Sequence, residues 1–226
     1  MNKFKKILIV AAHPDDEILG CGGTGLKFSQ EGHDVNVLFM TDGVSSRDTV
    51  QDMDRNERIN AAKIANEFMK FKIIEFGKFP DNQMDIVKLL EIVKFVEKHI
   101  KIIKPDVVFT HSFSDLNIDH RLTHQAVMTA CRPQPSKSVK EIYAFEVASS
   151  TGWNDIHINN FTPSKFVDIG DQIEKKLNAL EQYNMELLCY PHMRSREAIY
   201  NLNKFRGNMV GLNYAEAFEV IRLIEC

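Results

Sequence analysis

The sequence predicts an α/β fold, namely a single domain with a mainly parallel sheet flanked by helices. Short, β-branched apolar runs lack the alternation of half-buried strands, which is typical of strands buried on both faces. Segments with helical spacing of apolar residues separate these runs, as in βαβ units. The chain has 226 residues, 44% of them hydrophobic, which suffices for one domain with a sizeable core and leaves little room for a second.

The first strand and helix lie on either side of a proline. Residues 6–12 (KILIVAA) are apolar without alternation, and we expect this strand to end at His13-Pro14, because proline cannot donate to a sheet. A helix is expected between residues 17 and 31. Its start is expected to be interrupted, because Gly20, Gly22, Gly23 and Gly25 loosen the chain.

The next units repeat the pattern. Residues 35–40 read as a buried strand closed by the turn signal Asp42-Gly43. Residues 55–69 carry apolar or small side chains at helical spacing, and residues 71–76 form a third strand. A loop follows at Phe79-Pro80-Asp81-Asn82.

A long amphipathic helix is expected over residues 84–103, where apolar side chains recur at helical spacing. Pro105 breaks it, and residues 107–110 (VVFT) read as a fourth strand. A helix follows over about residues 119–130. These elements make up a core of about residues 1–132.

The pattern weakens in the remaining part, 133–226, which we interpret as a C-terminal elaboration of the same domain. We expect strands at 142–147 and 166–169 and helices at 172–186, 196–209 and 214–224. No internal repeat, low-complexity segment or linker divides the chain.

Composition excludes several classes of protein. Lys plus Arg is 28 and Asp plus Glu is 31, so the net charge of −3 gives no electrostatic basis for general nucleic-acid binding. No apolar run approaches the ~18 residues of a membrane span, so no stable membrane insertion is expected. The four cysteines form no CxxC pair, which favours reduced thiols and a cytoplasmic location. The sequence leaves homo-oligomerisation open.

Polar side chains follow each of the first four predicted strands. His13 follows the first, Asp42 the second, Asp81 the third, and residues 111–120 the fourth. Ligands of open α/β sheets bind beyond the carboxyl ends of the strands. These residues therefore mark the expected binding edge.

The segment His13-Pro14-Asp15-Asp16-Glu17 is the densest group of metal-ligand residue types in the chain. An imidazole and a carboxylate three positions apart can reach one metal ion, and a catalytic zinc takes three protein ligands and one open position. The segment 117–120 (NIDH) is the best source of the third ligand. The alternative is that the acidic residues only cap the next helix and supply favourable first-turn charges.

The other histidines carry weaker signals. His120 and His124 have the spacing of HExxH, but Arg121 replaces the catalytic Glu, so a zincin site is excluded. His111 is a candidate for the second coordination shell. No partners are predicted for His33, His99 and His157.

Motifs across nearly the whole chain resemble the LmbE-like, or PIG-L, de-N-acetylase family. The opening signature is His13-Pro14-Asp15-Asp16-Glu17 with Gly20-Cys21-Gly22-Gly23-Thr24. Six further matches follow in order: Thr41-Asp42-Gly43, Arg55 with Glu57 and Ala61-Ala62, Pro80-Asp81, Asn117-Ile118-Asp119-His120, Pro191-His192-Met193-Arg194-Ser195, and Arg206-Gly207 with Tyr214-Ala215-Glu216-Ala217-Phe218.

The resemblance implies a Rossmann-like fold and a divalent metal, usually Zn²⁺, with Fe²⁺ as a second candidate for such a donor set. His13, Asp16 and His120 match the ligand positions, and Asp15 matches the general base. Positions that line the substrate pocket in the family correspond to Arg55 and Asp81. Asp119 is a candidate second-shell carboxylate, because metal-bound imidazoles usually have one.

One departure from the family concerns the general acid. Many members have His-Pro-Asp-His where this chain has Asn117-Ile118-Asp119-His120. Asn117 cannot release a proton near neutral pH, although it can still contact substrate. We expect His192 to act instead as the acid or as a donor to the oxyanion, with Arg194 of the same segment contacting substrate. A structural loop histidine is the alternative for His192.

The expected activity is hydrolysis of the N-acetyl group of an acetamido sugar or sugar conjugate, nucleotide-linked sugars included, with release of acetate. A metal-dependent amidase acting on a non-sugar or thiol-conjugate amide is the alternative among enzymes. A nucleotide-binding module is the alternative from another class, because a Gly-rich turn can hold phosphate. The acidic His-Pro-Asp-Asp segment opposes it, since it puts negative charge where phosphate would lie.

Overall fold

The computed structural model describes residues 4–46, 52–135, 139–155, 157 and 160–225. Its centre is a seven-stranded sheet with the order β3-β2-β1-β4-β5-β7-β6. Strands β1 to β5 pair in parallel, and β7 runs antiparallel to both β5 and β6. The predicted fold class is therefore confirmed.

The elements alternate along the chain as the sequence predicts. The strands are β1 (Lys6–Ala11), β2 (Asp34–Phe39), β3 (Lys72–Phe76), β4 (Val107–His111), β5 (Glu141–Phe145), β6 (Lys165–Asp168) and β7 (Ala215–Leu223). The α-helices are α1 (Asp16–Gln30), α2 (Asp52–Phe68), α3 (Leu89–Ile103), α4 (Ile118–Ala130), α5 (Ala148–Thr151), α6 (Ile173–Leu180) and α7 (Arg196–Asn208), and the 3₁₀-helices are η1 (Met84–Ile86) and η2 (Glu181–Tyr183).

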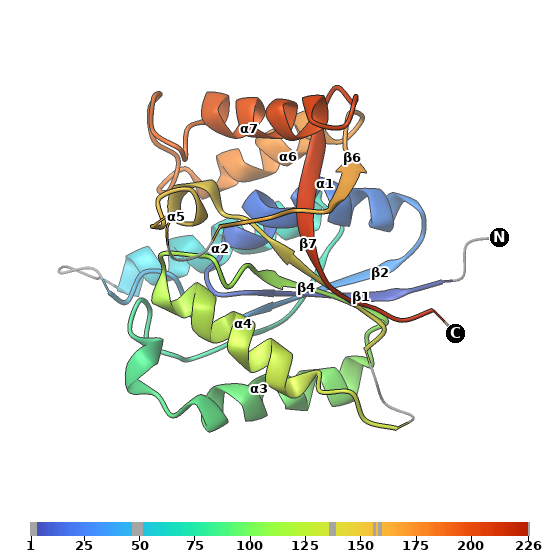
Figure 1. Ribbon diagram of the computed structural model, residues 1–226. Coiled ribbons are helices and arrows are strands. Elements are labelled where there is room, and N and C mark those ends of the chain that lie inside the picture. Colours follow the sequence, from blue (N-terminus) through green and yellow to red (C-terminus); the bar gives the residue numbers. More distant parts are fainter. Residues whose placement is uncertain (1–3, 47–51, 136–138, 156, 158–159, 226) are drawn as a thin grey trace.

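Helices cover both faces of the sheet (Figure 1). Helices α1, α2, α6 and α7 lie on one face and α3 and α4 on the other. Each face has its own buried apolar cluster, since alternate side chains of β1, such as Ile7 and Leu8, point to opposite sides. Among the described residues, we find no helix that combines the length and apolarity needed to cross a bilayer.

The strand order places the functional segments next to each other. Strand β1 pairs with β2 on one side and β4 on the other, with Ile7 aligned to both Val35 and Val107. The chain therefore reverses its winding direction between β1 and β4. His13 and the loop before α4 leave the sheet at this switch point, which is where open α/β sheets bind their ligands.

The glycines after His13 flank the interruption that the sequence predicts for this helix. They lie inside α1, which starts at Asp16 and bends at Cys21 (φ −147°, ψ 23°). A Cβ atom at Gly20 would collide with the ring of Phe145, and one at Gly25 would collide with Phe71. These glycines let α1 lie close against the sheet.

Two predicted helices are shorter than expected. The segment 84–103 begins with the 3₁₀-turn η1 and becomes α-helical only at Leu89. The segment 172–186 ends as α-helix at Leu180 and continues as η2. The short helix α5 has no counterpart in the sequence prediction.

The predicted helix over 214–224 is wrong, because this segment forms β7. Alanine and glutamate favour helices as isolated residues. In the fold, however, Phe218 pairs with Phe145 of β5 and Lys165 of β6, so the segment fills the gap between two strands. Tertiary pairing outweighs local propensity here.

A buried ion pair joins β7 to helices α1 and α6. The Nζ atom of Lys176, which is 1% exposed, lies 2.6 Å from Glu216 Oε1 and also donates to the carbonyl oxygen of Leu19. The Glu216 carboxylate accepts the backbone N–H groups of Gly23 and Thr24, just beyond the bend in α1. The pair thus fixes the helix whose first turn carries Asp16.

We expect Lys176→Met to lower the free energy of unfolding by about 3 kcal/mol, because it leaves a buried carboxylate without its counter-ion. For a domain of this size, the melting temperature should fall by about 6–12 °C. The control is Arg196→Met, which removes the exposed pairs with Glu174 and Glu181 and should cost less than about 1 kcal/mol. Equal losses in urea unfolding of the two variants would contradict this reading.

Candidate functional site

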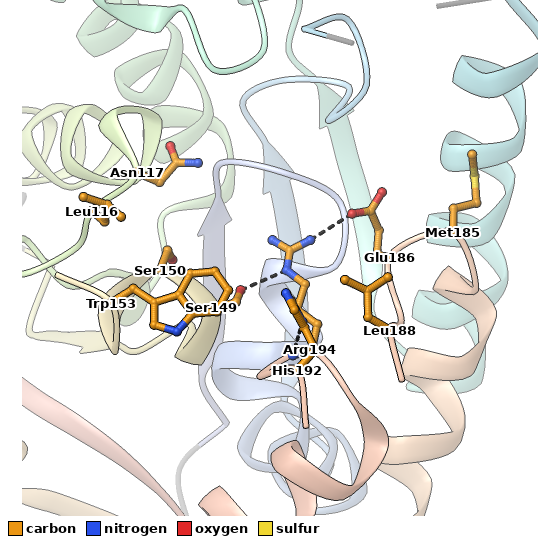
Figure 2. Close-up of a pocket in the computed structure, with 10 residues that line it drawn as sticks. All are labelled: Leu116, Asn117, Ser149, Ser150, Trp153, Met185, Glu186, Leu188, His192 and Arg194. Atoms are coloured by element: carbon orange, nitrogen blue, oxygen red, sulfur yellow. Dashed lines mark hydrogen bonds and ion pairs between the residues drawn. The ribbon is translucent and has the colours of Figure 1, made fainter. Parts of the chain in front are cut away.

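A cavity of about 450 Å³ opens at the carboxyl edge of the sheet (Figure 2). Its walls come from the loop after β4, from α5 and from the segment that precedes α7. The lining residues are Leu116, Asn117, Ser149, Ser150, Trp153, Met185, Glu186, Leu188, His192 and Arg194. Sequence-distant segments therefore meet at the edge predicted from the strand ends.

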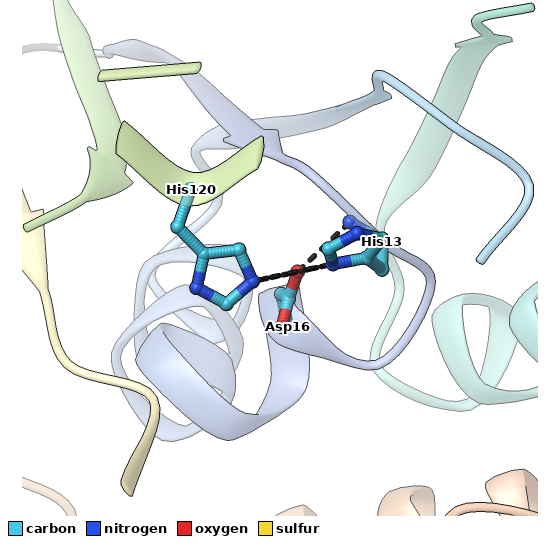
Figure 3. Close-up of side chains that lie close together, drawn as sticks. All are labelled: His13, Asp16 and His120. Atoms are coloured by element: carbon cyan, nitrogen blue, oxygen red, sulfur yellow. Dashed lines mark hydrogen bonds and ion pairs between the residues drawn. The ribbon is translucent and has the colours of Figure 1, made fainter. Parts of the chain in front are cut away.

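Three predicted ligand residues meet beside this cavity (Figure 3). His13 Nδ1 lies 3.1 Å from Asp16 Oδ2 and 3.2 Å from His120 Nε2. The third side, between His120 Nε2 and Asp16 Oδ2, measures 3.3 Å. All three side chains are buried.

The other nitrogen of each imidazole faces carboxylates. His13 Nε2 lies 3.2 Å from both Asp119 Oδ2 and Asp81 Oδ1, and His120 Nδ1 lies 3.1 Å from Asp115 Oδ2. Such contacts orient an imidazole and keep the nitrogen facing the site unprotonated when a metal is bound. Asp119 thus lies behind His13, while Asp115 has the corresponding place behind His120.

His111, the candidate for the second shell, stacks on the ring of His120 with centroids 3.9 Å apart. Its Nε2 accepts the backbone N–H of Ala12, which holds the end of β1. Burial and the neighbouring His120 keep the pKa of His111 well below its usual range. His111 therefore supports the cluster as a neutral ring.

The carboxylates dominate the electrostatics of the cluster. Burial opposes charge on His13, but hydrogen bonds to Asp119 and Asp16 raise its pKa to about 10. Burial likewise opposes charge on His120, yet Asp16 and Asp115 raise its pKa to about 9. Although burial disfavours a charged Asp16, the nearby His120 holds the pKa of Asp16 well below its usual range. The surroundings thus favour positive charge at this point.

The donor set fits a divalent cation. One atom from each of two imidazoles and one carboxylate form a triangle with nearly equal sides, and a tetrahedral zinc site with bonds of 2.0–2.1 Å separates its donors by about 3.3 Å. The second carboxylate oxygen of Asp16 is buried and accepts no hydrogen bond from the described residues. A cation here would give the buried Asp16 carboxylate a partner and would balance the negative charge of the surrounding carboxylates.

Asp15 lies directly before the first helical residue and has an unusual backbone, with φ 124°. Its N–H donates to the buried carboxylate of Glu17, which helps to hold this conformation. Asp15 Oδ2 lies 3.3 Å from guanidinium nitrogens of both Arg58 and Arg194. Oδ1 is buried and has no hydrogen-bond partner in the described part of the chain.

Glu186 connects the two arginines that contact Asp15. Its carboxylate oxygens lie 2.7 Å from Arg58 and 2.8 Å from Arg194. The arrangement anchors one oxygen of Asp15 and leaves the other available to accept a proton.

His192 lines the cavity, and its Nδ1 accepts the backbone N–H of Arg194 at 3.0 Å. Because a backbone amide can only donate, the neutral ring carries its proton on Nε2. This geometry favours a neutral ring that donates from Nε2. An imidazolium would carry a second proton on Nδ1, which would point at the N–H of Arg194 and break this hydrogen bond.

Of the four residues predicted to contact substrate, Asn117 and Arg194 line the cavity, whereas Arg55 and Asp81 do not. Asn117 lines the cavity, but its Oδ1 caps α4 by accepting the N–H of Asp119, and its Nδ2 donates to Asn82. Arg194 also lines the cavity. Asp81 is buried behind His13, where it orients the ring, and Arg55 pairs with Asp42 at 2.6 Å without lining this cavity.

Sequence reasoning missed several residues of this site. Four of them are Arg58, Asp115, Trp153 and Glu186. Asp115 was detectable, because it lies between the fourth strand and His120, where an orienting carboxylate is expected. Arg58 and Glu186 meet only through the packing of α2 against η2, and no local pattern predicts that contact. His99, for which no partner was predicted, contacts Glu75 at 2.8 Å.

The opening segment and the His120 segment, now seen to form one site, also match a known family. The model of PIG-L, described as GlcNAc-PI de-N-acetylase, matches residues 8–131, more than half of the chain. The chain belongs to the PIG-L family. This assigns it to a family of deacetylases.

Similar proteins of known sequence extend the likeness to nearly the whole chain. An uncharacterized deacetylase, YaiS, of Escherichia coli (strain K12) is 31% identical over 188 residues, which cover 80% of this chain and 92% of that protein. Diacetylchitobiose deacetylase of Thermococcus kodakarensis is 28% identical over 242 residues, covering 97% of this chain and 84% of that protein.

Among solved structures, N,N'-diacetylchitobiose deacetylase from Pyrococcus horikoshii has a TM-score of 0.78 and 22% identity, covering 96% of this chain and 84% of that chain. GalB, a 4-carboxy-2-hydroxymuconate hydratase from Pseudomonas putida KT2440, has a TM-score of 0.77 and 20% identity, covering 99% of each chain. These likenesses show the fold alone. The reaction must be argued from the side chains.

Proposed function

We propose that this PIG-L family member is a metal-dependent hydrolase that removes the N-acetyl group of an acetamido sugar or sugar conjugate and releases acetate. The observation that carries the proposal is the buried triangle of His13, Asp16 and His120 next to an Asp15 with one unpartnered oxygen. The relative named diacetylchitobiose deacetylase supports the choice of an acetylated sugar as the substrate.

His13, Asp16 and His120 would hold a divalent cation, which would lower the pKa of a bound water and polarise the amide carbonyl. Asp15 Oδ1 then accepts a proton from the attacking water, while Arg58 and Arg194 hold Oδ2 in place. The Nε2–H of His192 donates to the oxyanion of the tetrahedral intermediate.

The departing amine needs a proton, and Asn117 cannot provide one. In the proposed reaction, Asp15 returns the proton that it has accepted. His192 serves as a hydrogen-bond donor, because its Nδ1 is held as an acceptor by Arg194. This hydrogen bond supports the oxyanion role of His192 over the role of general acid.

We propose Zn²⁺ as the bound metal, because two imidazoles and a carboxylate are standard zinc donors. Fe²⁺ suits the same donors and remains the second candidate. We also propose a cytoplasmic location, which is supported by the free thiols of Cys21, Cys131 and Cys189 in the described residues.

Acetate release tests the proposed function. Zinc-loaded protein should release acetate from glycosides of N-acetylglucosamine or N-acetylgalactosamine, and protein treated with a chelator should not. Amide substrates without a sugar serve as the comparison for the alternative amidase. Faster turnover of such amides than of every acetamido sugar would contradict the proposal.

His192→Gln should lower kcat by about 10²-fold with metal content unchanged, because one donor to the oxyanion is lost. The pH dependence of kcat separates the two roles. An oxyanion donor leaves its shape unchanged in the variant, whereas loss of a general acid removes the limb on the alkaline side. Unchanged kcat in His192→Gln would exclude both roles.

A further inference from the structure

Trp153 forms one wall of the cavity beside the proposed metal site (Figure 2). It follows α5, and its ring meets that of His192 edge-on, with centroids 5.3 Å apart and an interplanar angle of 86°. The residue is 51% exposed. A large indole surface left against water at a binding cavity is available to a ligand with an apolar face.

Exposed apolar side chains also line the cavity, together with polar groups that are buried. Leu116 and Leu188 line the cavity and are 53% and 51% exposed. Ser150, in contrast, is buried and lies 3.3 Å from His120 Nδ1. A pyranose ring matches this distribution, because its faces consist of C–H groups and its perimeter of hydroxyl groups.

The charged side chains that line the cavity in the described structure are already paired with each other. Glu186 and Arg194 are the charged residues among those that line it in the described structure. Arg194 lies 2.8 Å from Glu186 and 3.3 Å from Asp15, and its Nε donates to Ser149. Its charge is therefore already balanced.

No lining residue in the described part of the chain offers an uncompensated cation to a phosphate. The guanidinium of Arg121 donates to the carbonyl oxygens of Asp115 and Leu116 and does not line the cavity. A sugar phosphate would thus lose hydration without gaining a counter-ion, because Arg58 and Arg194 are already paired with Asp15 and Glu186, and burying an unpaired charge costs free energy.

On the basis of the proposed function, we infer that the substrate is an uncharged acetamido sugar, free or in a neutral glycoside, whose ring stacks on Trp153. Trp153 acts here as a specificity-determining residue. Sugar phosphates and nucleotide-linked sugars are poor substrates, because the cavity offers their phosphates no counter-ion.

Binding can be measured separately from catalysis, because Trp153 is the single tryptophan of the chain. Zinc-loaded protein is titrated with the methyl glycosides of N-acetylglucosamine and N-acetylgalactosamine and with the matching sugar 1-phosphates, and tryptophan fluorescence is recorded. At least one glycoside should change the fluorescence saturably and bind about tenfold more tightly than its 1-phosphate. No saturable change with either glycoside, or equal or tighter binding of the phosphates, would overturn the inference.

The steady-state test uses the glycoside from which acetate is released fastest. Trp153→Ala should raise KM about tenfold with kcat little changed, as expected for lost apolar contact, and Trp153→Phe should restore most of the affinity. Phe205→Ala on α7 is the control, since Phe205 is similarly exposed (57%) but lies outside the cavity. An unchanged KM in Trp153→Ala would contradict stacking.

The inference and the proposed function fail in different ways. Saturable fluorescence changes with glycosides but no acetate release would support stacking on Trp153 and reject deacetylation. Acetate release with the same KM in wild type and Trp153→Ala would support deacetylation and reject stacking.

Discussion

Asp15→Asn should lower kcat by roughly 10²–10⁴-fold while the protein keeps its metal, because the general base is removed and the three metal donors are unchanged. Asparagine preserves the size of the side chain and tolerates positive φ better than most residues, which matters at φ 124°. Steady-state acetate release gives the rate, and elemental analysis gives the metal content.

The control for Asp15→Asn is Asp171→Asn, an exposed aspartate in the turn before α6. It should leave kcat unchanged. Activity of Asp15→Asn comparable to wild type would eliminate Asp15 as the base. It would also reject the proposal that Oδ2 anchors the side chain while Oδ1 accepts the proton.

Asp16→Ala should abolish both metal binding and activity, because it removes one of three donors from the triangle. Wild-type protein purified without chelators should contain about one divalent ion per chain. The graded comparison is Asp115→Asn, which alters only the carboxylate behind His120 and should weaken metal affinity by roughly 10–100-fold.

Competition with a chromophoric chelator measures these affinities, and thermal unfolding shows whether each variant is folded. Folded Asp16→Ala protein that still binds one ion with wild-type affinity would show that the metal lies elsewhere. The neighbouring triads of His111, Asp115 and His120 or of His13, Asp81 and Asp119 would then be the places to search.

The first half of the fold was predictable because local and tertiary preferences agree there. Strand β1 (Lys6–Ala11) is apolar after Lys6, which is typical of a strand covered by helices on both faces. Connections between parallel strands also allow few topologies. The edge at which His13, Asp81 and His120 meet follows from the strand ends. His13, Asp16 and His120 come together as the motif suggests.

The second half was less predictable, since its elements depend on partners far along the chain. The segment 214–224 has a helix-forming composition, but it becomes β7 because β5 and β6 offer hydrogen bonds on both sides. Glu216 can be buried there because its carboxylate pairs with Lys176 and accepts hydrogen bonds from two N–H groups of α1.

The sequence by itself therefore determined the fold class and the types of donor atom, because hydrophobic period and motif chemistry are local properties. The tertiary structure alone decided which carboxylate lies behind each imidazole, which oxygen of Asp15 is paired with arginines, and that Trp153 faces the cavity. These features depend on distances between residues that are far apart in the sequence. Arg58 and Glu186, for example, meet only because α2 packs against η2. Local sequence does not encode such a distance, because it results from the cooperative packing of the whole chain.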